Sequence, residues 1–235
     1  MSFDLSLVGC NTYLSSHAGR DKVGKLVHYL ARAITGLLAD RLKALSKGSP
    51  EHAAAQYYHD KFRALFVRVM DSRRTVRWFS SLGIVIALRK GPEAWPWKHK
   101  PAFFVSQLAM LVWHYVDHYR WLQTIGWLQG DQLESKRVSF SAFSLAAAVQ
   151  TVYYGNELRE QLEEGAKSGA DADKQAAKSL DTKLNLAKSA LTLVSVLHVS
   201  ELWLTHEFVC GITGAAASVI DIYQTFPRLA PPKKE

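Results

Sequence analysis

Apolar positions recur at helical spacing along nearly the whole chain, and the cleanest example is residues 20–45. Eight apolar residues there follow the i, i+3, i+4, i+7 rule and share one side of a helix: Val23, Leu26, Val27, Leu30, Ile34, Leu37, Leu38 and Leu45. Basic residues project from the opposite side: Lys22, Lys25, Arg32 and Lys43. Such a helix can pack into a soluble bundle, or it can lie in a membrane interface with its cations over anionic headgroups.

A second helical pattern covers residues 51–88, after Lys47-Gly48-Ser49-Pro50 breaks the chain. The first half of this pattern carries an apolar stripe made of Phe62, Leu65, Phe66, Val69 and Met70. From Arg73 onward the basic residues leave the register of that stripe. We therefore expect two shorter helices that meet near Asp71-Ser72, rather than one long amphipathic helix.

Two later segments approach the length of a membrane span, which needs roughly 20 predominantly apolar residues. Residues 208–226 contain a single charged residue, Asp221. Residues 101–122 are the second candidate, and a span there requires Asp117 and Arg120 to reach the interface or to face protein. The alternative for 208–226 is a buried helix with an alanine face.

Small residues at a spacing of four mark one side of the 208–226 segment: Gly211, Gly214, Ala215 and Ser218. In lipid, helices associate where small side chains let their backbones approach closely. We therefore predict that this side serves as membrane anchor and as the surface through which two copies associate. The basic tail that follows, with Arg228 and Lys233, favours a cytosolic C-terminus.

Strand signals are weak, because β-branched runs are short and no Asn-Gly or Asp-Gly hairpin turn occurs. The predicted fold is all-α, with membrane-associated amphipathic helices and one or two transmembrane helices. Four regions follow from the pattern. They are a basic N-terminal region (1–100), an apolar helical region with a candidate first span (101–160), a polar linker or solvent loop (161–183), and a C-terminal helical anchor with a basic tail (184–235).

Charge is unevenly distributed along the chain. Residues 1–100 hold 17 Lys and Arg against 7 Asp and Glu, whereas residues 101–235 hold 12 against 14. Six cations fall within residues 61–77 beside a single acid, Asp71: Lys61, Arg63, Arg68, Arg73, Arg74 and Arg77. A basic half of this kind indicates a polyanionic partner, either nucleic acid or an acidic membrane surface. No nucleic-acid-binding fold signature accompanies the arginines, so anionic lipids are the expected partner.

Enzyme motifs do not accompany these helices. The sequence has no G-x-x-x-x-G-K-[ST] loop and no G-x-G-x-x-G after a strand. His114 and His118 share a helix face at a spacing that binds metals, but the glutamate of such a motif and a third ligand are missing. Cys10 and Cys210 lie too far apart in sequence for a metal motif and form no disulfide scaffold. We expect no catalysis, no cofactor and no metal site.

The order of the sequence blocks resembles the peroxin-11 family of peroxisomal membrane proteins, including its glycosomal members. The first block is G-R-D-K-x-x-K-x-x-x-Y-x-x-R at residues 19–32. The second is S-R-R-T-V-R-W-F at residues 72–79, which leads into an apolar stretch ending at Leu88. The third is D-H-Y-R-W-L-Q-T-I-G at residues 117–126, and a glycine-rich apolar segment before a basic tail comes last.

The resemblance implies an integral or tightly bound protein of the peroxisomal (or glycosomal) membrane with both termini in the cytosol. It also implies self-association, contact with the organelle fission machinery, and a role in elongating the organelle before fission. The segment that matches the family's membrane-remodelling helix is residues 56–82. Its expected membrane-binding residues are Lys61, Phe62, Arg63, Leu65, Phe66, Arg68, Val69, Arg73, Arg74 and Arg77.

Two other functions stay open at this point. The runner-up is a metabolite channel or pore, in which several copies bring Asp117, His118 and Arg120 together around a lumen. A soluble helical scaffold is the third reading.

Overall fold

The computed structural model describes residues 3–168 and 172–228, except the side chains of 166–168 and 172–177. Over these residues the structure is all-helical, as predicted, and its only β-type pairing is a single bridge between Phe3 and Arg228. The α-helices are α1 (Leu7–Ser15), α2 (His17–Ala44), α3 (Pro50–Val76), α4 (Ser80–Arg89), α5 (Lys100–Thr124), α6 (Gln132–Ser168), α7 (Ala172–Val199) and α8 (Glu207–Thr225).

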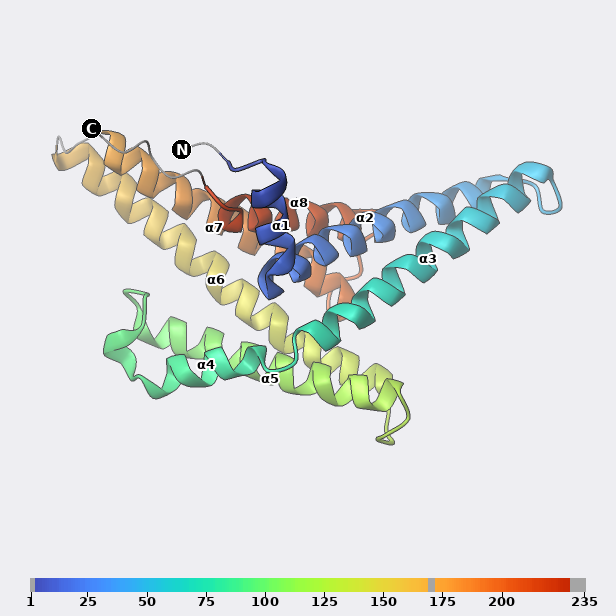
Figure 1. Cartoon of the computed structure of the whole chain (residues 1–235), viewed down its shortest axis with the longest axis horizontal. Helices are drawn as coiled ribbons and strands as arrows, with labels where there is room; N and C mark the ends of the chain where they lie inside the picture. The colour runs from blue at the N-terminus through green and yellow to red at the C-terminus, as the bar shows by residue number, and fades with distance from the viewer. Residues whose placement is uncertain (1–2, 169–171, 229–235) are drawn as a thin grey trace.

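Long helical hairpins build the molecule. Helices α2 and α3 form one hairpin that projects to the right in Figure 1, and α6 and α7 form another that projects to the left. Helix α8 packs against both α2 and α7 and so joins the two hairpins. Helices α4 and α5 lie together on the lower side of this view, and α5 packs along α6.

The break between α2 and α3 lies where the sequence predicts it. Gly48 adopts a positive φ of 90°, which a residue without Cβ tolerates. The Ser49 side chain accepts a hydrogen bond from the backbone N–H of His52 and caps α3, and Pro50 occupies the first helical turn.

The second break lies at Arg77–Phe79 and not at Asp71-Ser72, so the prediction of two helices meeting at 71–72 is wrong. Helix α3 runs unbroken to Val76, and the chain turns at Phe79, whose φ is 69°. The arginines that leave the register of the apolar stripe find partners on other helices. Their polar groups therefore do not require the helix to end.

The solvent loop expected over 161–183 is helical instead over 161–168 and 172–183. This stretch is rich in alanine and lysine, which are good helix formers even where few apolar residues are available to pack. The hydrogen bond from Gln161 Nε2 to Thr182 Oγ1 joins α6 to α7 at 2.9 Å. Over the described residues, polar composition here therefore marks helices rather than a loop.

Residues 101–122 and 208–226, the two candidate spans, fall within α5 and α8 respectively. Over the described residues, none of the helices combines the length and the apolar character needed to cross a bilayer.

Candidate membrane-facing surface

Helix α2 buries a different side from the one its leucines mark. Its buried residues are Gly19, His28, Tyr29, Ala31, Ala33, Thr35 and Gly36. Glycine and alanine on this side let α8 approach closely, and His28 Nδ1 lies 2.9 Å from the Phe66 carbonyl of α3. With α8 and α3 occupying these sides, Val27, Leu30 and Leu37 of the predicted apolar stripe stay exposed. These three residues are therefore available to a membrane or a partner, whereas Leu26 of the same stripe packs against the core.

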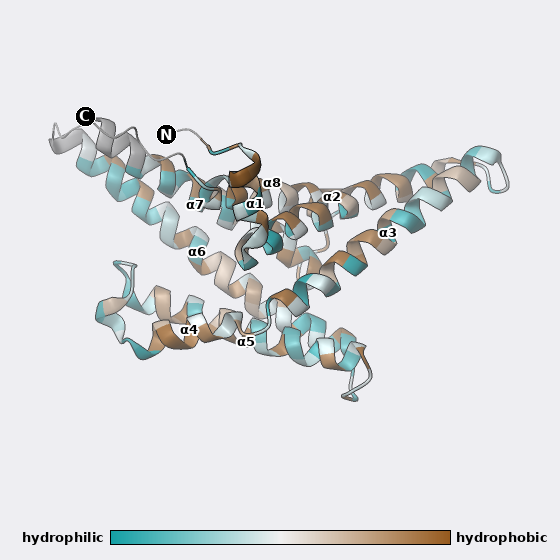
Figure 2. Cartoon of the chain, viewed as in Figure 1, coloured by the Kyte–Doolittle hydropathy of each residue, from teal (hydrophilic) through white to brown (hydrophobic). Residues whose placement is uncertain are grey.

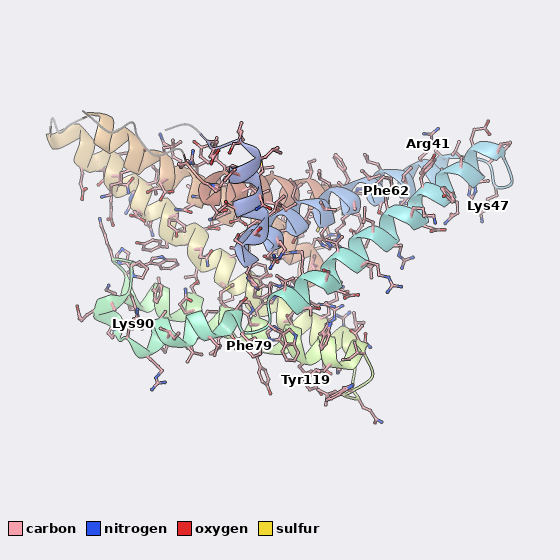
Figure 3. All side chains as sticks on the ribbon, in the orientation of Figure 1. Arg41, Lys47, Phe62, Phe79, Lys90 and Tyr119 are labelled. Carbon is pink, nitrogen blue, oxygen red and sulfur yellow. The ribbon has the colours of Figure 1, made fainter. Side chains whose placement is uncertain are left out.

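Helix α3 presents only part of its predicted membrane-binding set to solvent. Lys61, Arg63, Leu65 and Arg68 are exposed. In contrast, Phe62, Phe66 and Val69 are partly buried, and the Phe66 ring meets the His28 ring of α2 edge-on at 5.7 Å. Figure 3 shows Phe62 part-way along the hairpin, with Arg41 and Lys47 towards its tip. The aromatic stripe of α3 is thus engaged by α2, and cations and Leu65 remain at the surface.

Arg73, Arg74 and Arg77, which the sequence predicts to bind a membrane, instead pair with carboxylates of the same chain. Arg73 Nε binds Asp21 of α2 at 3.0 Å. Arg74, only 1% exposed, binds Asp71 and Asp117, and Arg77 Nη2 binds the other oxygen of Asp117 at 3.0 Å. A buried cation needs a carboxylate and full hydrogen bonding. These arginines therefore hold α3 to α2 and α5.

The charged groups around Arg73 and Arg77 change the pKa values of their neighbours. Burial alone would raise the pKa of Asp21, but Arg73 and Arg77 outweigh it and hold that pKa below its usual value. Burial lowers the pKa of Arg77, and the neighbouring Arg73 lowers it further. Cations therefore crowd this part of the molecule.

Helix α4 is an apolar element that the sequence analysis did not single out as a site. None of its residues is buried, and Phe79 (70% exposed), Leu82 (55%) and Ile86 (54%) face solvent. Its last residue is Arg89 and the next is Lys90, and Figure 3 shows Phe79 and Lys90 at opposite ends of α4. The sequence feature that could have identified α4 is a short, nearly uninterrupted apolar run between basic residues. This run is too short to meet the length needed for a membrane span.

Helix α8 turns its small residues towards α2 of the same chain, where the sequence analysis expected a second copy. A Cβ on Gly211 would lie 2.4 Å from the Ala33 backbone nitrogen, and one on Gly214 would lie 2.3 Å from the Tyr29 ring. Ala215 and Ser218 are also buried. The close approach predicted for this side is therefore real, but it packs one chain and leaves the side no room for another helix.

The charge inside α8, Asp221, is paired and buried. Three lysines surround its carboxylate: Lys25 at 2.9 Å, Lys22 at 3.4 Å and Lys188 at 3.5 Å. Although burial opposes ionisation, these lysines lower the pKa of Asp221 to about 2. Asp221 thus joins α8 to α2 and α7 as a charged group.

The outward side of α8 is apolar, as is much of α1. Exposed hydrophobic residues on these two helices are Leu7, Val8, Leu14, Val209, Ile212, Val219 and Tyr223. Figure 2 shows hydrophobic segments on α1, along the α2–α3 hairpin and on α4. A large contiguous apolar patch is typical of a membrane or protein contact site, and these exposed residues are candidates for one.

Of the residues considered for a channel, Asp117 is buried within one chain, and His118 and Arg120 are partly buried. Asp117 is engaged by Arg74 and Arg77, and the His118 ring packs against Trp78 at 5.4 Å. Burial lowers the pKa of Arg120 to about 10. Among the described residues no group of three or more His, Cys, Asp or Glu is arranged to hold a metal ion.

The model of the peroxisomal biogenesis factor 11 (PEX11) family matches residues 8–226. The chain belongs to the PEX11 family. The match spans every helix described above except the first residue of α1, so it includes both hairpins and α4. No curated protein and no solved structure matches the chain.

PEX11 membership makes this chain a peroxisomal membrane protein that acts in peroxisome proliferation. PEX11 is a family of biogenesis factors and not one known for enzymes.

Proposed function

We propose that this PEX11-family chain elongates the peroxisomal membrane by inserting α4 into the cytosolic leaflet. The outward apolar sides of α1, α2 and α8 extend the contact, and both termini stay on the cytosolic side. An apolar helix buried in one leaflet occupies headgroup area without filling the acyl depth beneath it, which favours positive curvature. The shape change therefore follows from one-sided insertion.

The observation that carries this proposal is the exposed apolar side of α4, on which Leu82, Val85 and Ile86 are 55%, 36% and 54% exposed. A helix of 10 residues is about 15 Å long, roughly half the thickness of the hydrocarbon core. Such a helix suits the interface rather than a crossing. Exposing Phe79, Leu82 and Ile86 to water is unfavourable, and burial in lipid contributes on the order of 2 kcal/mol per large apolar side chain.

Surface cations support the attachment. Arg89 and Lys90 stand at the end of α4, and Lys61, Arg63 and Arg68 are exposed on α3. Each cation near an anionic surface contributes on the order of 1 kcal/mol, which falls off within a Debye length. Arg73, Arg74 and Arg77 make no such contribution in this proposal, because they are engaged in ion pairs with carboxylates of the same chain.

Self-association and contact with the fission machinery belong to the same proposal. Because α2 fills the small-residue side of α8, we place self-association on the exposed apolar sides of α1 and α8. One or two membrane spans and a metabolite channel stay predictions from the sequence, and we argue for neither.

Tubulation of anionic vesicles tests the proposed role of α4. The variant carries Leu82→Glu and Ile86→Glu, and the control carries Leu162→Glu and Leu180→Glu. The control positions are similarly exposed (59% and 50%) but lie on the α6–α7 hairpin. We expect the α4 variant to leave vesicles spherical and the control to form tubules as the parent does. Equal tubulation by both variants would refute insertion of α4.

A further inference from the structure

A cavity of about 330 Å³ lies between α2, α3, α5 and α6, beneath the exposed residues His17 and Ala18. Its walls differ in chemistry. Helices α2 and α3 line it with six cations: Lys22, Lys25, Arg32, Arg73, Arg74 and Arg77. Helices α5 and α6 line it with apolar and aromatic side chains: Met110, Trp113, Phe140 and Phe143.

The cations around this cavity outnumber their carboxylates. Asp21 and Asp117 are the acidic residues in its wall, and the other carboxylates that pair with these cations, Asp71, Glu207 and Asp221, do not line it. Asp221 is shared by three lysines, of which Lys22 and Lys25 line the cavity. Burial lowers the pKa of Lys25, and the neighbouring Lys22 and Arg73 oppose its charge too. The site therefore has positive charge to spare.

Hydrogen-bond donors in the wall also lack acceptors. Arg77 Nε and Trp113 Nε1 are buried and have no hydrogen-bond partner. The Arg77 guanidinium lies 4.9 Å from the centre of the Trp113 ring, so both donors belong to the same part of the wall. Buried donors without acceptors are unfavourable, and an anion in the cavity would satisfy them.

We propose that this cavity binds a small organic phosphate, with the phosphoryl group on the α2–α3 wall and the non-polar part on the aromatic wall. Arginine forks match the oxygens of a phosphate, and charge-assisted hydrogen bonds to it are strong. The volume lies in the range of small-ligand pockets, which combine apolar walls with a few polar groups. The ligand is either the headgroup of an anionic phospholipid or a soluble phosphate ester. Insertion of α4 does not use this cavity, so the two proposals can fail separately.

Two lysines provide a matched test. Lys22 and Lys188 both approach Asp221 Oδ1, at 3.4 and 3.5 Å, and their side chains are 29% and 26% exposed. Lys22 lines the cavity and Lys188 does not. Lys22→Gln and Lys188→Gln therefore remove the same kind of ion pair, but only the first removes a cation from the cavity. Trp113→Phe keeps an aromatic ring and removes one unpartnered donor.

Isothermal titration calorimetry on the full chain in neutral detergent measures binding. The probes are phenyl phosphate, dihexanoyl phosphatidic acid as monomers, and phenol as the uncharged control. We expect one phosphate probe to bind with 1:1 stoichiometry and phenol not to bind. Lys22→Gln should raise the Kd about tenfold and Trp113→Phe severalfold, because each removes a hydrogen bond to the anion. Lys188→Gln should change the Kd less than twofold.

Tighter binding of dihexanoyl phosphatidic acid would support the proposal with a lipid headgroup as the ligand, and tighter binding of phenyl phosphate would support it with a soluble ester. No saturable binding of either phosphate up to about 10 mM would overturn it. So would equal weakening by Lys22→Gln and Lys188→Gln, since that result would indicate general charge attraction.

Discussion

Arg74 of α3 and Asp117 of α5 form a buried ion pair, in which the guanidinium Nε lies 3.1 Å from the carboxylate Oδ1. The two side chains are 2% and 4% exposed. The same carboxylate accepts from Arg77, one turn further along, where α3 ends. This pair fixes the end of α3 on α5, and thereby sets the position of the turn at Phe79 from which α4 departs.

Asp117→Asn should destabilise the fold by about 3 kcal/mol, because two buried guanidinium groups lose their shared carboxylate. Chemical denaturation followed by circular dichroism measures the free energy of unfolding. The control is Asp60→Asn, whose carboxylate is 60% exposed and pairs with its neighbour His59. If both variants unfold at the same denaturant concentration as the parent, the pair does not hold α3 on α5.

Gly214→Ala should destabilise the chain, because its Cβ would lie 2.3 Å from the Tyr29 ring and force α8 away from α2. Gly155→Ala is the matched control. It is also a glycine within a helix, but the atom nearest to its added Cβ would be Leu186 Cδ1, at 3.9 Å. Alanine there should raise stability by about 0.5–1 kcal/mol. The two melting temperatures should therefore shift in opposite directions, and a rise for both would contradict the packing of α8 on α2.

Stability should fall as the pH is lowered from about 6.5 towards 4. Burial lowers the pKa of His28 to about 3 and that of His114 to about 4. The unfolded chain thus binds these protons at a higher pH than the folded chain, so acidification through this window favours unfolding. His114→Phe removes one of the two groups and should flatten the dependence of the free energy of unfolding on pH. An unchanged slope in urea titrations at pH 6.5, 5.5 and 4.5 would contradict burial of a neutral His114.

Substitutions of exposed basic residues should affect vesicle binding, whereas substitutions of buried basic residues should affect thermal stability. Replacing Lys61, Arg63 and Arg68 by Gln should weaken cosedimentation with anionic vesicles by up to about 3 kcal/mol and leave the melting temperature unchanged. Arg74→Gln should lower the melting temperature, because Asp117 and Asp71 lose their buried partner. Loss of vesicle binding by a folded Arg74→Gln variant, with the triple variant unaffected, would reverse these assignments.

The sequence pattern predicted those features of the fold that depend on residues close together in the sequence. The all-α class, the break at Lys47–Pro50 and the helix over 208–226 follow from apolar spacing, from turn residues and from uninterrupted apolar character. Small residues in 208–226 permit a close helix contact, which the sequence analysis assigned to a second copy and which α2 of the same chain makes in the structure. Whether that partner is a second chain or α2 is a matter of tertiary structure.

Ion pairs between residues far apart in the sequence explain where the structure differs from the sequence-based predictions. Arg73 and Arg74 read as surface cations because their carboxylates, Asp21 and Asp117, lie 52 and 43 residues away. The same pairs allow α3 to continue past Asp71, where local register predicted a break. For Leu30 and Leu37 of α2 the sequence left open a bundle core or a membrane interface. In the structure α8 packs against the glycine and alanine side, where the backbones come closer, and both leucines are exposed.

The depth of Ile86 in a vesicle tests the insertion of α4 most directly. A Cys10→Ser background leaves Cys210, which is fully buried and whose pKa burial raises to about 11, so it resists labelling. A nitroxide at Ile86→Cys reports depth through its relative accessibility to oxygen and to a water-soluble nickel complex, and a label at Leu162→Cys is the control. We predict that Ile86 lies below the headgroups of anionic vesicles while Leu162 stays in water. Equal access of the nickel complex to both labels, on protein bound to the vesicles, would contradict the account.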